Sequence, residues 1–304
     1  MNALSFERFG GPDVLRYGAI ADPEPADGEV LVRTGAIGLN FADVYRRRGD
    51  YHLAGAPPYI AGYEAAGAIV GTGERVAFAD SPFANAELVA VPREKLIPLP
   101  DDISDETAAA LLLQGLTAYF LTHDTHAVRP GERVLVHAAA GGVGSLLVQI
   151  AKLRGAYVVG LASSEAKRAA VLEAGAERAL GYDAWTDERD FDVVYDSVGS
   201  TLGESLAAAR TGGHVVFYGM AGGNPDPVDP RALMDRSLTL SGGDLWNVLR
   251  SRADRVARAE TLFGWVRDGR LRVRVAERFP LARGADAHRY LESRAAIGKV
   301  LLVP

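Results

Sequence analysis

The sequence predicts an α/β protein in which a doubly wound parallel sheet of the Rossmann type accompanies a second, β-rich domain. The strongest observation is a glycine loop at 138–144, which follows an apolar strand-like run and opens a helical pattern. Short apolar strands then alternate with amphipathic helices as far as residue 219, which is typical of a parallel sheet. The first hundred residues instead show short strand-like runs broken by prolines, which predicts a β-rich domain.

The first section ends where a helix is expected to begin. Its strand-like runs are 29–34, 65–70 and 87–91. A boundary is predicted near 100–104, because Ser104 can cap a helix whose first turn carries Asp105 and Glu106. The apolar body of that helix, 108–121, is expected to bridge the two domains.

The glycine loop indicates a nucleotide site at the end of the first strand of the second domain. Gly141 and Gly144 leave room for the backbone to approach a pyrophosphate and for the helix to pack on the strand. The helix that starts after Gly142 would offer unpaired N–H donors to phosphate. Small residues also make ordinary tight turns, so the pattern alone leaves both interpretations open, and the alternating elements favour the nucleotide.

The end of the second strand indicates which dinucleotide is bound. An NAD site usually places a carboxylate about 20 residues after the glycine loop, but 161–164 contains none. Ser163 and Ser164 can donate hydrogen bonds there, and Lys167 can supply a cation for a 2′-phosphate. NADPH is therefore favoured over NADH. In the alternative, Lys167 is a solvated helix residue and Glu165 binds the ribose.

The tail of the chain returns to mixed α and β structure. A helical stretch is predicted over 247–267, followed by strand-like runs at 271–279 and 298–304. This tail is expected to rejoin the first domain. The predicted domains are accordingly 1–107 with 246–304, and 108–245.

Composition limits the possible partners. The chain has 304 residues, is 48% hydrophobic and 24% charged, and carries a net charge of −6, which argues against nucleic acid or an anionic membrane as the main ligand. It has no cysteine, which excludes disulfides, a cysteine nucleophile and thiolate-bound zinc. No signal-like start and no long apolar run is present, so a cytoplasmic location is expected.

Six motifs, in order along the whole chain, resemble the zinc-independent quinone oxidoreductases of the medium-chain dehydrogenase/reductase superfamily, the group that includes zeta-crystallin. The motifs are NFADVYRRRGDY at 40–51, GYEAAG at 62–67, QGLT at 114–117, AAAGGVG at 138–144, DVVYDSVG at 192–199 and LESR at 291–294. The resemblance implies a GroES-like β domain, a Rossmann domain and an active site in the cleft between them. The segments near Gly71 and Ser81 are shorter than in that family, which leaves the substrate open.

The resemblance also implies roles for individual residues. Asn40, Asp43 and Tyr51 would line or brace the substrate side, and Asn40 or Tyr45 would donate one hydrogen bond to the developing oxyanion. The residues expected to bind the cofactor are Tyr45, Thr117, Ala140, Gly141, Gly142, Val143, Ser163, Ser164, Lys167, Tyr182, Gly219 and Arg294. Bland alternatives are packing for Tyr45 and Tyr51, an ordinary helix hydroxyl for Thr117, and a structural ion pair between Asp43 and Arg47.

The resembling family implies chemistry without a metal. Zinc-dependent relatives carry a histidine where this chain has Tyr63. The expected activity is NADPH-dependent reduction of a quinone by direct hydride or electron transfer. An NADPH-dependent reductase of α,β-unsaturated carbonyls and a non-enzymatic, crystallin-like nucleotide-binding protein are the alternatives. A homodimer is expected, formed by pairing an exposed edge strand at 237–241.

Overall fold

The computed structural model describes residues 1–304, which divide by their internal contacts into two compact units. Unit 1 comprises 1–113, 249–264 and 273–304, and unit 2 comprises 114–248 and 265–272. The α/β fold class predicted from the sequence is confirmed. The predicted domain ranges stay a prediction, because grouping by contacts does not show which segments fold independently.

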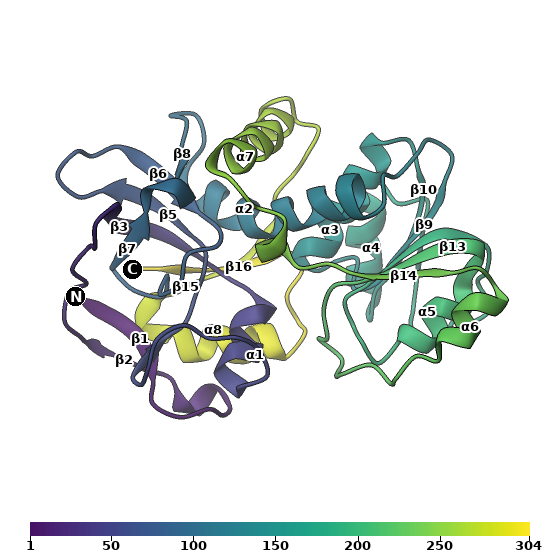
Figure 1. Cartoon of the computed structure of the whole chain (residues 1–304), viewed down its shortest axis with the longest axis horizontal. Coiled ribbons are helices and arrows are strands. Elements are labelled where there is room, and N and C mark those ends of the chain that lie inside the picture. The colour runs from purple at the N-terminus through teal and green to yellow at the C-terminus, as the bar shows by residue number, and fades with distance from the viewer. The chain divides into compact units, whose positions relative to one another are not determined.

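Unit 1 is built around β-sheets, as the proline-broken strand pattern predicts (Figure 1). Its strands are β1 (Asn2–Phe6), β2 (Arg16–Ala19), β3 (Glu29–Leu39), β4 (Tyr59–Ile60), β5 (Ala65–Ile69), β6 (Arg75–Phe78), β7 (Leu88–Pro92), β8 (Ile97–Pro98), β15 (Val275–Pro280) and β16 (Lys299–Val303). One sheet has the order β2-β1-β4, and the other has the order β15-β16-β3-β5-β6-β8, with β7 also paired to β3. The C-terminal strand β16 pairs antiparallel with β3, so the tail does rejoin the first section.

Three helices belong wholly or largely to unit 1, and a fourth starts in it. They are α1 (Phe41–Arg48), α7 (Arg252–Arg267), α8 (Gly284–Glu292) and the first half of α2 (Asp105–Phe120). Helix α8 packs against β15, β16 and α1. Alternating apolar residues of the strands form the core, with Phe6, Ile37 and Phe78 among its fully buried side chains.

Unit 2 is the parallel sheet with crossover helices that the alternating pattern predicts. Its strands are β9 (Arg133–Val136), β10 (Tyr157–Leu161), β11 (Arg178–Leu180), β12 (Phe191–Asp196), β13 (Ala209–Phe217) and β14 (Thr239–Gly242), and its helices are α3 (Gly142–Leu153), α4 (Glu165–Glu173), α5 (Leu202–Ala208) and α6 (Pro230–Asp235). The strand order is β11-β10-β9-β12-β13-β14, and every pair is parallel. The chain moves outward in opposite directions from β9, so α3 and α4 cover one face and α5 and α6 the other (Figure 1).

Two predicted helix starts can be compared with the structure. Ser104 caps α2, because its Oγ accepts a hydrogen bond from the Thr107 N–H at 3.1 Å. The helix expected from residue 247 begins only at Arg252, since Ser251 accepts a hydrogen bond from the Asp254 N–H at 3.1 Å and caps it there. None of the helices combines the length and apolarity needed to span a bilayer.

A buried histidine joins α1 to α8. The Nη1 group of Arg47 lies 3.0 Å from Nδ1 of His288, and Nη2 of Arg47 donates to Oε1 of Glu292 at 2.7 Å. Burial, reinforced by the positive charge of Arg47, lowers the pKa of His288 to about 3. His288 therefore stays neutral in the folded protein at any pH near neutrality.

His288 should make the free energy of unfolding depend on pH. In the unfolded chain His288 takes up a proton below its ordinary pKa near 6.5, whereas the folded protein resists protonation down to about 3. The free energy of unfolding should therefore fall as the pH drops below 6.5, at about 1.4 kcal/mol per pH unit from this group. His137 of unit 2, with a pKa of about 4, should act in the same direction.

Urea unfolding at several pH values between 7.5 and 5 measures this slope. The variant His288→Asn should lose the part of the slope that comes from His288 and keep the part from His137. Equal slopes in the variant and the unmodified protein would contradict the assignment.

Candidate functional site

Two glycines of the loop in unit 2 lie close to neighbouring atoms, and Gly144 leaves no room for a side chain. A Cβ atom at Gly144 would lie 2.3 Å from the Ala138 carbonyl oxygen and 2.8 Å from Cα of Ala139. At Gly142, a Cβ would lie 2.0 Å from Oε1 of Gln114. The loop therefore presses onto the end of β9, and α3 begins at Gly142 with its first-turn N–H groups at the carboxyl edge of the sheet. A cradle of this kind fits a pyrophosphate.

The end of β10 lies at the same edge. Val159 and Gly160 are paired in register with Leu135 and Val136 of β9, so the residues that follow both strands emerge together. Ser163 and Ser164 are exposed there. Ser164 caps α4 by accepting a hydrogen bond from the Lys167 N–H at 3.4 Å, which places Lys167 in the first turn of that helix.

The side chain of Tyr182 binds the backbone at the start of the loop. Its hydroxyl accepts a hydrogen bond from the Ala138 N–H at 2.9 Å, and Ala138 has a left-handed φ of 47°. The ring of Tyr182 lies 5.8 Å from that of the buried His137, whose ring meets Trp185 edge-on at 4.9 Å. Burial lowers the pKa of His137 to about 4, so this ring is neutral near pH 7.

A buried carboxylate completes this edge. Asp196, the last residue of β12, accepts hydrogen bonds from the N–H groups of Val198 and Gly199 and from the hydroxyls of Thr201 and Ser205, at 2.6–3.0 Å. It thereby fixes the turn that leads into α5. Sequence reasoning assigned no role to Asp196. Its position at the end of the apolar run of β12 was nevertheless a signal that its carboxylate could accept hydrogen bonds from the turn that follows.

The remaining predicted cofactor residues fall into both units. Gly219 follows β13, whose register with β12 places its end beside Asp196, and a Cβ at Gly219 would lie 3.2 Å from the Ser197 carbonyl oxygen. Thr117 lies on α2 one turn beyond Gln114, the residue that touches Gly142, so both face the start of α3. Unit 2 thus gathers Thr117, Ala140, Gly141, Gly142, Val143, Ser163, Ser164, Lys167, Tyr182 and Gly219. Tyr45 and Arg294 belong to unit 1.

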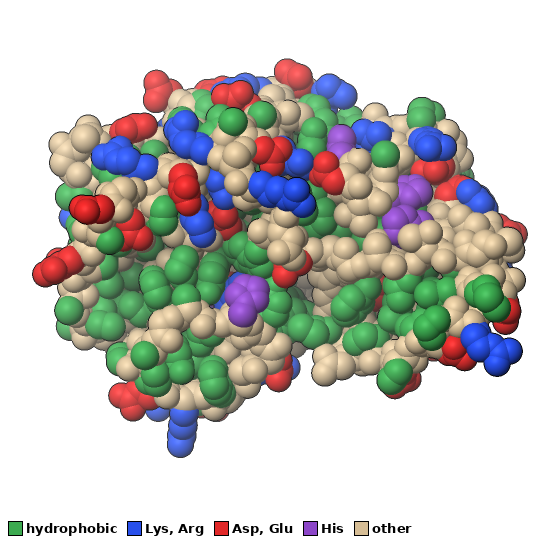
Figure 2. Space-filling view, in the orientation of Figure 1, with side chains coloured by type: hydrophobic (Ala, Val, Ile, Leu, Met, Phe, Trp, Pro, Cys, Tyr) green, Lys and Arg blue, Asp and Glu red, His purple; other side chains and the backbone are tan.

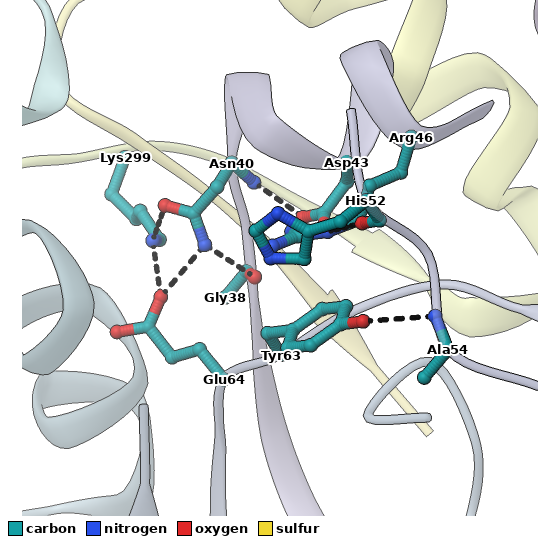
Figure 3. A network of polar contacts seen from close by, with 9 residues as sticks. All are labelled: Gly38, Asn40, Asp43, Arg46, His52, Ala54, Tyr63, Glu64 and Lys299. Carbon is teal, nitrogen blue, oxygen red and sulfur yellow. Dashed lines mark hydrogen bonds and ion pairs between the residues drawn. The ribbon is translucent and has the colours of Figure 1, made fainter. Parts of the chain in front are cut away.

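A buried polar network in unit 1 surrounds Asn40, at the junction of β3 and α1 (Figure 3). Its side-chain Nδ2 donates to the Gly38 carbonyl at 3.1 Å and to Oε2 of Glu64 at 3.0 Å. Its Oδ1 accepts from Nζ of Lys299 at 2.8 Å, and the same ammonium lies 2.6 Å from Oε2 of Glu64. Asn40, Glu64 and Lys299 are all buried, so they form a closed internal network.

The backbone of Asn40 also starts α1. Its N–H donates to Oδ2 of Asp43 at 2.9 Å, which is the return bond of a capping box. Asp43 is fully buried, and burial raises the pKa of its carboxyl although the nearby Arg46 opposes the change. The capped helix then carries Tyr45, which is half-buried and lies with its ring 6.1 Å from that of Phe41.

Arg46 attaches the segment that contains Tyr51 to α1. Its guanidinium is fully buried, lies 3.6 Å from the ring centre of Tyr63 and 5.0 Å from that of Tyr51, and donates to the His52 carbonyl at 3.1 Å. The Tyr63 hydroxyl accepts from the Ala54 N–H at 3.2 Å (Figure 3). Arg46 thus contacts both Tyr51 and Asp43, and the place of Tyr51 on the substrate side stays a prediction.

The suggested ion pair between Asp43 and Arg47 is wrong. Asp43 lies 3.3 Å from Arg46, the residue three positions on, and Arg47 pairs with Glu292 of α8. Residues three and four positions apart both lie near a given helix side chain, so the sequence did not decide between the two arginines. Because α8 packs against α1, Glu292 lies within reach of Arg47, and Arg47 pairs with Glu292 and not with Asp43. Sequence reasoning also gave no role to Arg46 and Gln114, although both lie in the motifs at 40–51 and 114–117, nor to Lys299, which lies in no motif.

The chain is similar along its whole length to known proteins. Residues 26–81 match the family model described as alcohol dehydrogenase GroES-like domain, and residues 171–302 match the one described as zinc-binding dehydrogenase. A quinone oxidoreductase of Pseudomonas aeruginosa is 38% identical, with 99% of each chain covered, and a 2-haloacrylate reductase of a Burkholderia species is 37% identical, with 99% of this chain and 98% of the relative covered. The solved quinone oxidoreductase of Escherichia coli in complex with NADPH superposes over 100% of both chains, with a TM-score of 0.95 and 34% identity.

Enlarging Gly144 should damage the dinucleotide site. In Gly144→Ala the added methyl group meets backbone atoms of 138–139, so the loop must shift, and the affinity for the predicted dinucleotide should fall at least tenfold. Fluorescence titration with NADPH measures this.

Gly203→Ala is the matched control, since a Cβ at Gly203 in α5 meets no atom within 4 Å. This second variant should bind as the unmodified protein does and unfold at the same or a slightly higher temperature. Unchanged affinity in Gly144→Ala would show that the loop is not the phosphate cradle.

Proposed function

Since the chain belongs to the zinc-independent quinone oxidoreductases of the medium-chain dehydrogenase/reductase superfamily, we propose that it catalyses the NADPH-dependent reduction of quinones. The observation that carries this function is the carboxyl edge of the unit 2 sheet, where a phosphate cradle adjoins two serines and a lysine. No carboxylate precedes Lys167 between 161 and 164 to repel a 2′-phosphate.

In this proposal, different residues of this edge bind different parts of NADPH. Bound NADPH supplies the hydride for the reaction. The N–H groups at Gly142 and Val143 hold the pyrophosphate, and Ser163, Ser164 and Lys167 hold the 2′-phosphate. Tyr182 keeps the loop in shape through Ala138. The roles carried over from the family resemblance are part of the proposal: Tyr45 and Thr117 near the nicotinamide, and Arg294 near the phosphates.

The geometry of unit 1 supports different roles for Asn40 and Tyr45. The two hydrogens of the Asn40 amide are donated to Gly38 and Glu64, so Asn40 braces the site from within. Tyr45 is then the better donor to an oxyanion that develops on the substrate. Asp43 holds the helix that carries Tyr45, and Tyr51 lines the substrate side.

Reduction of an activated carbon–carbon double bond is the second candidate. The specific observation in its favour is the similarity to a 2-haloacrylate reductase, which is 37% identical to this chain. We place quinones first, because several relatives at 35–38% identity over the full chain are quinone oxidoreductases.

A substrate and cofactor assay tests the function. We expect the purified protein to oxidise NADPH with a small quinone faster than with a medium-chain enal, and to use NADH poorly. In Lys167→Ala, the affinity for NADPH should fall about 10- to 100-fold, as expected for loss of one hydrogen bond between charged groups, while that for NADH should not change.

Lys152→Ala is the control, because Lys152 lies at the opposite end of α3 from the loop and pairs with Glu177. Turnover of the enal alone would promote the second candidate. A preference for NADH in the unmodified protein would overturn the role of Lys167.

A homodimer formed through β14 belongs to the same proposal. β14 is the last strand of its sheet, so one of its sides offers unpaired backbone groups to a second copy of the chain. The cytoplasmic location expected from the sequence stays a prediction.

Sedimentation velocity at micromolar concentration should show a dimer. Thr239→Lys, which adds a charge to the exposed edge strand, should weaken it, whereas Thr186→Lys, at an exposed position outside the strands of the same unit, should not. A monomer in the unmodified protein would refute the dimer.

A further inference from the structure

The ammonium group of Lys299 is buried inside unit 1, where it contacts the residue from which α1 starts. We propose that Lys299 is a positioning residue of the enzyme, which fixes the Asn40 side chain and, through it, helix α1 and Tyr45. The proposal rests on the proposed function, because it assigns Lys299 a part in the same reaction.

The contacts of Lys299 join two segments that are distant in the sequence. Nζ donates to Oδ1 of Asn40, 259 positions away, and to Oε2 of Glu64, 235 positions away (Figure 3). The other carboxylate oxygen of Glu64 accepts the Leu113 N–H of α2 at 2.6 Å. The ammonium thus ties β16 to the end of β3, to the segment before β5 and to α2.

The carboxylate of Glu64 cannot move away to compensate for a lost partner. It is fully buried and packs closely against Gly38 of β3. A Cβ at Gly38 would lie 2.2 Å from Oε2 of Glu64, and it would also lie 2.4 Å from the Ala109 carbonyl oxygen. A buried carboxylate that loses its cation is strongly unfavourable, so the surroundings must rearrange or the group must take up a proton. Either change alters the hydrogen bond that Asn40 donates to it.

Asn40 passes such a change on to α1. Lys299 binds its side-chain oxygen and Glu64 its side-chain nitrogen, so together they set the orientation of the amide. The backbone of the same residue forms the N-terminus of α1. The Asp43 N–H donates to the Asn40 carbonyl at 3.0 Å, and the Asn40 N–H donates to the Asp43 carboxylate. Tyr45 lies in the second turn of this helix, so its hydroxyl depends on where the helix begins.

The first test replaces Lys299 by Met, which keeps most of the side-chain volume and removes the charge. We expect kcat for the quinone to fall at least tenfold in Lys299→Met while the affinity for NADPH stays within twofold, because the residues proposed for the phosphates in unit 2 are untouched. Amide hydrogen exchange of 40–48 should become faster, and that of 142–153 should not change. Lys152→Met removes another ion-paired lysine and should leave kcat and the exchange of 40–48 unchanged.

A double variant separates positioning from charge balance. If Lys299 merely neutralises Glu64, Glu64→Gln together with Lys299→Met should restore kcat. The proposal expects no restoration, because the Asn40 oxygen still lacks its ammonium donor.

The absence of cysteine allows chemical rescue even if Lys299→Met folds poorly. Lys299→Cys can be alkylated with 2-bromoethylamine while unfolded, which rebuilds an ammonium on a side chain of nearly the same length, and then refolded. We expect this form to regain at least a third of kcat, measured against unmodified protein taken through the same unfolding and refolding. The uncharged form made with iodoacetamide should not recover.

Three results would overturn the proposal: a folded Lys299→Met with kcat within twofold of the unmodified protein, full recovery in the double variant, or equal activity of the two alkylated forms. If the unmodified protein reduces no quinone, the proposed function fails. Hydrogen exchange at 40–48 still tests the link from Lys299 to α1 in that case, since it needs no turnover.

Discussion

The burial of the Glu64 carboxylate is the constraint around which unit 1 is arranged. The group is fully shielded from water and therefore needs both a cation and hydrogen-bond donors. Lys299 of the last strand, the amide of Asn40 and the Leu113 N–H supply them. Because each partner comes from a different segment, satisfying one charge fixes the last strand, the start of α1 and the first half of α2 relative to one another.

Close backbone approach is the corresponding constraint in unit 2. The parallel strands end at one edge, and the loop after β9 lies so near Ala138 that Gly144 admits no side chain. Tyr182, which binds the Ala138 N–H, and the neutral His137 support the loop, and the buried carboxylate of Asp196 fixes the neighbouring turn. Lys167 supplies a positive charge in the first turn of α4. In the proposed function, backbone donors of this edge bind the pyrophosphate and a side-chain cation binds the 2′-phosphate.

Much of the fold and the identity of the cofactor were predictable from local patterns. The α/β class, the membership of the quinone oxidoreductase family and the use of NADPH are confirmed. They depend on short motifs and on the period of apolar residues, which a single sequence displays. The partner of Asp43 was not predictable, because Arg46 and Arg47 both lie within reach along the helix and only the position of Glu292 on α8 decides between them.

The sequence by itself determined the glycine loop, the alternation of strands and helices after it, and the absence of an acid before Lys167, because each of these is written in neighbouring residues. Only the tertiary structure decided that Lys299 meets Glu64 and Asn40, that Gln114 lies against Gly142, and that Arg46 stacks on Tyr63. The physical reason is distance along the chain. Contacts between residues up to 259 positions apart follow from how strands pair and helices pack, and no local period or motif records them.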